Sequence, residues 1–252
     1  MPWNPEQYHK FQAQRSAPFE DLLRLVQIRP NLKVVDLGCG TGELTNRLFE
    51  TLPKSNVLGV DNSPQMLAKA VLHQHPGLVF ELGDQSNLQG SWDLIFSNAA
   101  LQWSENHSRL MSRLYNSLTA GGQIVVQVPS NHSHISHRLI IETAQEEPFC
   151  SILNNFLRIA PVLLIDQYAQ IFFDLGAENI NVYEKVYGHV LENSDAVVEW
   201  VSGTALVPYF ERLGAEKDAF LVRLREKMQQ CLPGSPVFYP FKRILFSANK
   251  PR

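Results

Sequence analysis

Short apolar runs alternate with amphipathic stretches along residues 19–129. The runs are four to six residues long and hold few polar positions, whereas the stretches between them repeat apolar residues at helical spacing. This alternation is typical of parallel strands buried between crossover helices. It predicts strands at residues 33–37, 57–60, 78–82, 92–97 and 124–128.

Residues that favour helix ends punctuate the stretches between these strands. We expect a helix over residues 63–73 because Ser63 can cap it and Pro64 suits its first turn. The Gly-Gly turn at 121–122 is expected to close a helix over residues 109–118. Two more helices are expected, over residues 19–26 and 43–52.

After Pro129 the regular alternation gives way to longer helical and aromatic-rich segments. Because crossovers between parallel strands are right-handed, the pattern predicts an α/β fold, a three-layer doubly wound sandwich. All of residues 1–252 are expected to form a single domain, with helical inserts at 131–165 and 194–232. The remaining elements expected are helices at 167–175, 194–213 and 215–231 and strands at 180–187 and 238–248.

Composition removes several classes of function. The 22 basic and 25 acidic residues give a net charge of −3, so no basic field is available for a nucleic-acid backbone. Three widely spaced cysteines fit neither a disulfide framework nor a metal site, which favours a reducing compartment. No apolar stretch is long enough for a membrane span, and the polar first residues do not resemble a secretory signal. We therefore expect a cytoplasmic protein that binds neither membrane nor nucleic acid.

The most specific motif is VVDLGCGTG at residues 34–42, where a strand ends and three glycines follow at alternate positions. Glycine lets such a tight turn adopt positive φ and leaves the backbone open to a ligand. The spacing does not fit the dinucleotide fingerprint, and no Lys-Ser/Thr pair follows to make a phosphate loop. The motif predicts a nucleoside site, with a plain glycine-rich turn as the alternative.

Acidic residues end three successive strands. Asp36, Asp61 and Asp84 lie at the ends of the first, second and third strand. Asp61 is placed to accept both ribose hydroxyls, and Asp84 to accept an exocyclic adenine amine. Three carboxylates at one sheet edge would repel a phosphate, so they favour a cationic cofactor with a free ribose.

The motifs VVDLGCGTG, GVDNSPQML, LGD and DLIFSNAALQW resemble those of class I S-adenosylmethionine-dependent methyltransferases across residues 30–130. The resemblance implies a seven-stranded, mostly parallel sheet whose last strand is antiparallel. It makes residues 30–130 the cofactor-binding half, which uses S-adenosyl-L-methionine and releases S-adenosyl-L-homocysteine. The implied cofactor-binding residues are Tyr8, Arg15, Asp36, Gly38, Cys39, Gly40, Asp61, Asn62, Met66, Asp84, Gln85 and Asn98.

A closer resemblance, carried by WNPEQYHKFQAQRSAP, SNAALQW, EEPF and EWVSGTALVPYF, is to the trans-aconitate 2-methyltransferase family. It implies that Gln14 and Trp103 hold the acceptor carboxylate as catalytic residues. The large apolar area of Trp200 and Tyr209, and the hydroxyl of Tyr209, predict that these two residues also contact the substrate. For Trp200, a helix that packs its aromatic stripe into the core is an equal alternative. The two inserts would form a lid over the acceptor pocket. Val207 stands where that family has an Arg suited to a second carboxylate, which leaves a less anionic acid open.

We therefore expect an S-adenosylmethionine-dependent O-methyltransferase that forms a methyl ester on a small, trans-aconitate-like carboxylic acid. The alternatives are a methyltransferase acting on malonyl-carrier protein or another carboxylic acid, and a non-catalytic protein that binds S-adenosylmethionine. An acidic carrier protein would need a basic surface, for which Arg212, Lys217, Arg223, Arg225 and Lys227 are candidates. His132, His134 and His137 lack a neighbouring acid or Cys, so no metal is expected.

Overall fold

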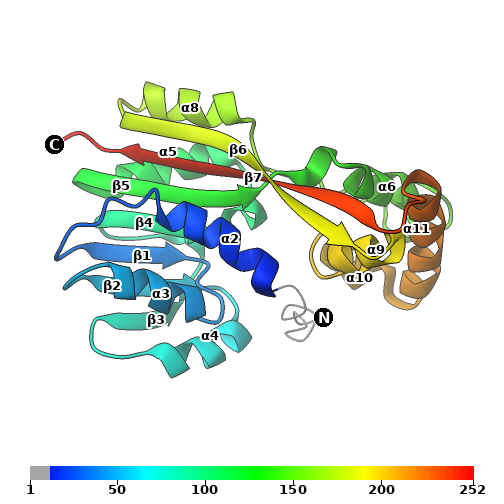
Figure 1. The fold of residues 1–252 in the computed structure, drawn as a ribbon, viewed down its shortest axis with the longest axis horizontal. Helices are drawn as coiled ribbons and strands as arrows, with labels where there is room; N and C mark the ends of the chain where they lie inside the picture. The colour runs from blue at the N-terminus through cyan, green and yellow to red at the C-terminus, as the bar shows by residue number, and fades with distance from the viewer. Residues whose placement is uncertain (1–11) are drawn as a thin grey trace. The chain divides into compact units, whose positions relative to one another are not determined.

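The structure, a computed structural model, describes residues 12–252, with side chains described from residue 17 onward. Seven strands form one mixed sheet in the order β3-β2-β1-β4-β5-β7-β6 (Figure 1). Strands β1 to β5 pair in parallel, and β7 runs antiparallel to β5. The predicted fold class and the antiparallel last strand are confirmed. The strands are β1 Lys33–Leu37, β2 Asn56–Asp61, β3 Leu78–Leu82, β4 Trp92–Asn98, β5 Leu118–Pro129, β6 Glu178–Leu191 and β7 Val237–Asn249.

The chain divides into two compact units, which we treat separately. The sheet unit comprises residues 16–129, 161–185 and 243–252. The helical unit includes residues 130–160 and 186–242, a range that takes in most of the two inserts expected from the sequence. The single-domain organisation stays a prediction.

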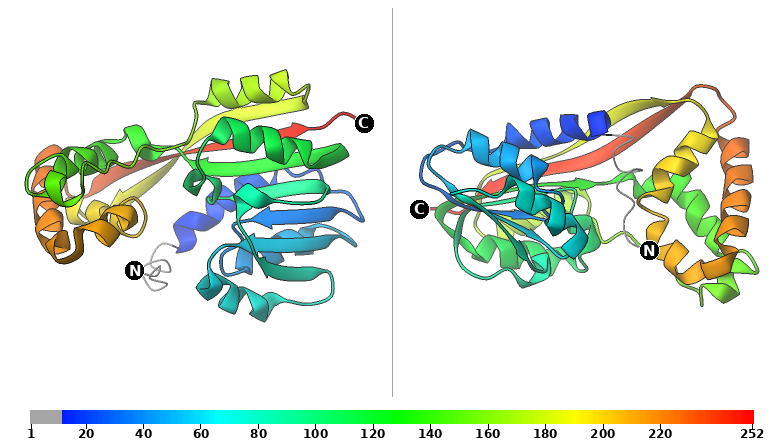
Figure 2. Two further views of the ribbon diagram at one scale, coloured as in Figure 1. Left: turned by 180° about the vertical axis from the view of Figure 1, so that it is seen from behind. Right: turned by 90° about the horizontal axis from the view of Figure 1, so that it is seen from below.

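Helices cover both faces of the sheet in the sheet unit (Figures 1 and 2). On one face, Phe19 and Leu22 of α2 pack with Phe96 and Leu245 of the strands. On the other face, the core formed with α5 and α8 includes the stacked pair Tyr168 and Phe246. The sheet is thus buried on both sides, as its nearly continuous apolar strands predict. The helices are α2 Gln12–Leu23, α3 Glu43–Thr51, α4 Pro64–Ala70, α5 His107–Asn116 and α8 Ile165–Asp174.

The prediction for the turn before β5 was wrong. Helix α5 ends at Asn116, where the backbone N–H of Ser117 donates to carbonyl oxygens of the last turn, and the two glycines lie inside β5. A Cβ on Gly122 would come within 2.9 Å of the Thr119 carbonyl oxygen. Beside these glycines the register of β5 against β4 shifts. The glycines therefore permit an irregularity in the strand, and they do not end the helix.

The helical unit has its own core. Helix α11 packs on α6 and α9, and its Phe220 lies in the same apolar cluster as Trp200, Tyr209 and Tyr239. The helix expected over residues 194–213 is two helices, since a turn separates α9 from α10. The helices are α6 Ile135–Ala144, α7 Phe149–Ile152, α9 Ser194–Ser202, α10 Val207–Leu213 and α11 Lys217–Cys231.

Across the described residues, no helix is both long and apolar enough to cross a bilayer.

Candidate cofactor and acceptor site

The glycine loop after β1 presents bare backbone at the sheet edge. Gly38, Gly40 and Gly42 all have positive φ. A Cβ on Gly38 would lie 2.1 Å from the Cβ of Ala100, which follows β4. The loop thus contacts the residues after β4. Strands β2 and β3 lie on one side of β1 and β4 lies on the other, so the order of the strands reverses at this position. Ligands of open α/β sheets bind at such a switch point.

Asp61 is fixed in place by the loop that it faces. Its Oδ2 accepts a hydrogen bond from the Gly40 amide at 2.9 Å, and its Oδ1 accepts one from the Ser63 amide at 2.9 Å. Each carboxylate oxygen has two acceptor positions, so both can still accept a ribose hydroxyl. Asp61 is therefore a preorganised acceptor pair.

Asp36 lies buried beneath the loop. Its Oδ2 accepts the Thr45 hydroxyl of α3 at 2.6 Å. Burial, reinforced by the neighbouring charge of Asp61, raises the pKa of Asp36 to about 7 despite the hydrogen bond from Thr45. Burial of Cys39, together with the charges of Asp36 and Asp61, raises the pKa of its thiol. The Cys39 side chain is therefore an uncharged thiol at neutral pH.

The residues after β3 connect this edge to the turn after β4. The Gln85 amide donates to the Ala100 carbonyl at 3.2 Å and to the Ser104 hydroxyl at 2.7 Å. The exposed Asp84 accepts the hydroxyl and the amide of Ser86, and these bonds lower its pKa. Asp84 is therefore ionised at neutral pH.

Two further residues predicted to bind the cofactor, Asn62 and Met66, lie at the start of α4. Its cap is confirmed, because the Ser63 hydroxyl accepts the Met66 amide at 3.3 Å. Met66 is half-buried, and Asn62 is exposed. Asn62 thus follows Asp61 at the sheet edge, while Met66 sits in the first turns of the helix.

Asn98 is the last residue of β4, and its Oδ1 is buried without a hydrogen-bond partner in the described part of the chain. A buried acceptor of this kind suits the ammonium group of a methionine moiety. Together with the Asp61 acceptors and the open glycine backbone, it makes the residues present a good fit for S-adenosylmethionine.

The predicted acceptor residues are placed as follows. Trp103 ends the 3₁₀ turn Leu101–Trp103 after β4, and it is 38% exposed. Gln14 and Arg15 lie in α2, but their side chains, and Tyr8 entirely, lie outside the described residues. Trp200 and Tyr209 are buried in the helical unit, and their contact with an acceptor stays a prediction.

Tyr209 and Trp200 have clear structural partners. The Tyr209 hydroxyl accepts the Arg158 amide at 3.0 Å, and its ring stacks on Phe220. Trp200 packs against Tyr239 and Phe241. The alternative weighed for Trp200, a helix packing its aromatic stripe into a core, therefore describes its surroundings in this unit.

Three further residues at this edge escaped sequence reasoning. Gln127 and Arg243 are buried on β5 and β7, and they hydrogen-bond each other. His107, at the start of α5, bonds the Leu101 carbonyl at 2.9 Å. For Gln127 and Arg243 the sequence carries one weak signal, a polar residue inside an otherwise apolar strand.

No group of three or more His, Cys, Asp or Glu side chains among the described residues is arranged to hold a metal ion. Burial, together with its two histidine neighbours, lowers the pKa of His137 to about 4. His134 contacts Ser136, whose hydroxyl lies 3.2 Å from that of Tyr239. His134 and His137 thus belong to a polar network of the helical unit that includes Ser136 and Tyr239.

Comparison with known proteins agrees with this geometry. A family profile described as "Methyltransferase domain" matches residues 28–170. The fold, the site and this match define an enzyme of the S-adenosylmethionine-dependent methyltransferase class, as expected from the sequence. The chain is 49% identical to the trans-aconitate 2-methyltransferase of Deinococcus radiodurans, over 100% of this chain and 99% of that one. It is 36% identical to that of Methylobacterium nodulans, over 99% of both chains. The chain belongs to the trans-aconitate 2-methyltransferase family.

Solved structures share the fold. The Bacillus subtilis protein YcgJ superposes with a TM-score of 0.62 at 12% identity, over 94% of this chain and 99% of that one. A Haemonchus contortus phosphoethanolamine N-methyltransferase, solved with S-adenosyl-L-methionine, gives 0.56 at 19% identity, over 96% of this chain and 53% of that one. At these identities the likeness concerns the fold alone.

Proposed function

We propose that this enzyme methylates one carboxylate of trans-aconitate, giving a methyl ester and S-adenosylhomocysteine. The single observation that carries the proposal is the 49% identity to a trans-aconitate 2-methyltransferase, which extends over the whole of both chains. It therefore spans both the glycine loop and the Trp103 turn. We further propose a cytoplasmic location, which the three free cysteines support.

Methyl transfer to a carboxylate does not require the protein to activate the acceptor. A carboxyl group has a pKa of about 4, so it is already a nucleophile at neutral pH and needs no general base. Bound S-adenosylmethionine supplies an electrophilic methyl group on a positively charged sulfur. The acceptor oxygen forms a bond to the methyl carbon while the carbon–sulfur bond breaks, and the electron pair stays on sulfur. No proton moves.

The residues of the chain then have to bind and position. Asp61 would hold the ribose and Asn98 the amine, which fixes the direction of the methyl group. The Trp103 indole N–H is a single rigid donor that can orient the acceptor carboxylate, and Gln14 would supply a second. Orientation of two reactants is worth up to about 7–11 kcal/mol, so placement alone can supply most of the catalysis.

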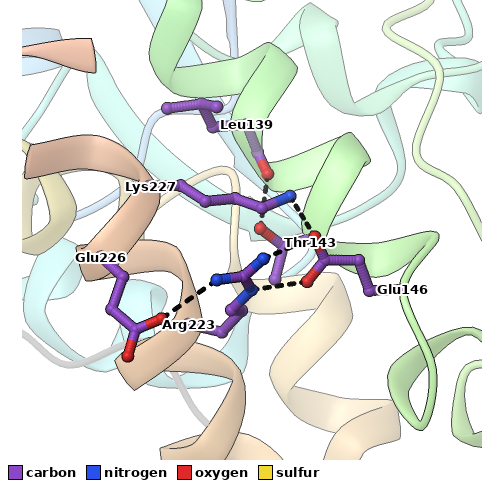
Figure 3. A network of polar contacts seen from close by, with 6 residues as sticks. All are labelled: Leu139, Thr143, Glu146, Arg223, Glu226 and Lys227. Carbon is purple, nitrogen blue, oxygen red and sulfur yellow. Dashed lines mark hydrogen bonds and ion pairs between the residues drawn. The ribbon is translucent and has the colours of Figure 1, made fainter. Parts of the chain in front are cut away.

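A carrier-protein substrate finds less support. Three of the five cations that could meet an acidic partner are engaged by acids of the same unit. Glu146 pairs with Arg223 and Lys227, each at 2.7 Å (Figure 3), and Asp195 lies 3.7 Å from Arg225. The two bonds from Arg223 and Lys227 lower the pKa of Glu146 to about 2. The charge of this helix face is therefore largely offset at neutral pH.

A turnover panel tests the proposal. S-Adenosylhomocysteine release would be followed with trans-aconitate, citrate, short monocarboxylates, fatty acids and malonyl-carrier protein as acceptors. We expect the highest kcat/KM with trans-aconitate, and loss of all turnover in Asp61→Ala. A preference for the malonyl carrier, or cofactor binding without turnover on any acid, would refute it.

A further inference from the structure

Three polar side chains line up where β4, β5 and β7 meet the carboxyl edge of the sheet unit. Asn98 pairs in register with Gln127, and Arg243 pairs with Pro129, two residues further along β5. Side chains two residues apart on a strand share a face. Phe96, Val125 and Leu245 all pack in the cluster formed with α2. Asn98, Gln127 and Arg243, each two residues nearer the carboxyl edge of the sheet, therefore lie on that same face.

Arg243 puts a permanent charge into this row. It is only 7% exposed, and its Nη1 donates to the Gln127 Oε1 at 3.0 Å. An Arg side chain cannot lose its proton in a protein, so burial does not neutralise it. A guanidinium held in this position is suited to bidentate pairing with a carboxylate.

Gln127 adds an oriented donor beside that charge. Its side chain is fully buried, and its Nε2 has no hydrogen-bond partner within the described residues. Because its oxygen accepts from Arg243, the amide nitrogen is the group left to face a ligand. An unsatisfied buried donor costs about 1–3 kcal/mol, which a bound acceptor would relieve. The pair therefore offers a cation and an N–H donor together.

The geometry points to Arg243 and Gln127 as a carboxylate subsite that binds a non-reacting carboxylate of the acceptor, an inference that rests on the proposed function. Trans-aconitate carries three carboxylates, and it must approach an edge that already holds Asp36, Asp61 and Asp84. A compensating cation is needed there. Arg243 supplies it from a strand, whereas position 207 holds valine.

Sheet order favours the acceptor over the methionine carboxylate of the cofactor, which has the same chemistry. The glycine loop and Asp61 follow β1 and β2, while Gln127 and Arg243 lie beyond β4 on β5 and β7. With strands about 4.8 Å apart, β7 lies roughly 10 Å from β4. An extended Arg side chain and a small tricarboxylate can together bridge that distance.

The test separates acceptor binding from cofactor binding. Arg243→Met is expected to raise the KM for trans-aconitate about 10- to 100-fold, the loss of a charged hydrogen bond. The dissociation constant for S-adenosylhomocysteine, measured by calorimetry, should stay within about twofold. Arg109→Met, which removes an exposed cation from α5 of the same unit, is the matched control and should leave both values unchanged. An unaltered KM in folded Arg243→Met would overturn the subsite.

A second variant guards against misfolding and keeps the cation. Gln127→Glu places a carboxylate against the same guanidinium, so it should fold and still bind trans-aconitate more weakly by repulsion. If both variants bind S-adenosylhomocysteine more weakly while the KM for trans-aconitate is unchanged, the subsite would belong to the cofactor and the inference would be refuted.

Calorimetry with tricarballylate, an unreactive tricarboxylate, on the product-bound enzyme makes the inference independent of turnover. Loss of tricarballylate binding in Arg243→Met supports the subsite even if the true acceptor is another polycarboxylate. If the wild type turns over trans-aconitate but Arg243→Met binds tricarballylate as tightly as the wild type does, the proposed function would be supported and the subsite refuted.

Discussion

The raised pKa of the proposed cofactor residue Asp36 predicts that cofactor binding depends on pH. Burial raises the pKa of its carboxyl group to about 7, so near neutral pH both forms are populated in the free chain. A cationic ligand favours the ionised form, and binding therefore releases protons below that pKa. The raised pKa also affects stability. Between about pH 4 and 7 the folded chain without cofactor keeps a proton on Asp36 that the unfolded chain loses, so its free energy of unfolding should fall as pH rises through this range.

We predict that affinity for S-adenosylmethionine rises with pH, by up to about tenfold per unit between pH 5 and 7, and levels off above pH 8. Calorimetric titration over that range measures it. In Asp36→Asn the dependence should flatten. A wild-type profile that is already flat would show that Asp36 does not sense the cofactor's charge.

The role proposed for Trp103 concerns the acceptor and not the cofactor. In Trp103→Phe an aromatic ring is kept and the N–H donor is lost, so we expect kcat/KM for trans-aconitate to fall about 10- to 100-fold, the value of one hydrogen bond to a charged group. Affinity for S-adenosylhomocysteine should be near normal. Equal turnover by the two proteins would remove Trp103 from the site.

The sequence could place the proposed cofactor residues together because they are adjacent in sequence to the ends of strands. Within one βαβ unit, the Gly38 amide donates to the Val60 carbonyl and the Gly40 amide to Asp61. The pairing of Gln127 with Arg243 could not be predicted, since it depends on the register between two strands more than a hundred residues apart.

At the level of elements, a buried hydrogen-bond chain holds the turn that carries Trp103. The Leu163 amide donates to the Tyr168 hydroxyl, which lies against the His107 Nδ1. The other ring nitrogen lies 2.9 Å from the Leu101 carbonyl. Burial lowers the pKa of His107, so the ring is neutral and its single hydrogen sits on Nε2, donating to Leu101. Helices α5 and α8 thereby anchor the turn after β4.

Tyr168→Phe breaks this chain in the middle. We predict a loss of about 1–3 kcal/mol in stability, from the unsatisfied His107 nitrogen, and a lower kcat/KM for the acceptor at unchanged cofactor affinity. Tyr115→Phe is the matched control, because that hydroxyl makes only a 3.4 Å contact to the Asn249 carbonyl in the same core.

A double-mutant cycle with Trp103→Phe distinguishes positioning from a merely structural effect. If Tyr168 acts through Trp103, the two losses in kcat/KM should not add. Additive losses would mean that the chain stabilises the core without placing the indole.

Most strands matched their predicted ranges closely, because continuous apolar runs mark buried strands. The end of α5 was misplaced because Gly121 and Gly122 serve a strand irregularity, which only the pairing with β4 reveals. The break between α9 and α10 was likewise hidden, since the apolar spacing continues through Gly203 and the turn after it.

At the scale of the whole molecule, the charges along the carboxyl edge of the sheet are complementary to the charges of the two reactants. The carboxyl edge offers acidic groups to a cationic cofactor on β1 and β2, and a buried cation further along on β7. A sulfonium and a carboxylate lose their opposite charges as the methyl group moves. The enzyme therefore gains by excluding water from both.

The most direct test of the account is the position of the transferred methyl group. S-Adenosylmethionine labelled with ¹³C in its methyl group would be incubated with the enzyme and trans-aconitate, and the product examined by two-dimensional carbon–proton correlation NMR. We predict that the labelled methyl correlates with a carboxyl carbon and that mild base releases it as methanol. A label attached to carbon, or no labelled product at all, would contradict the account.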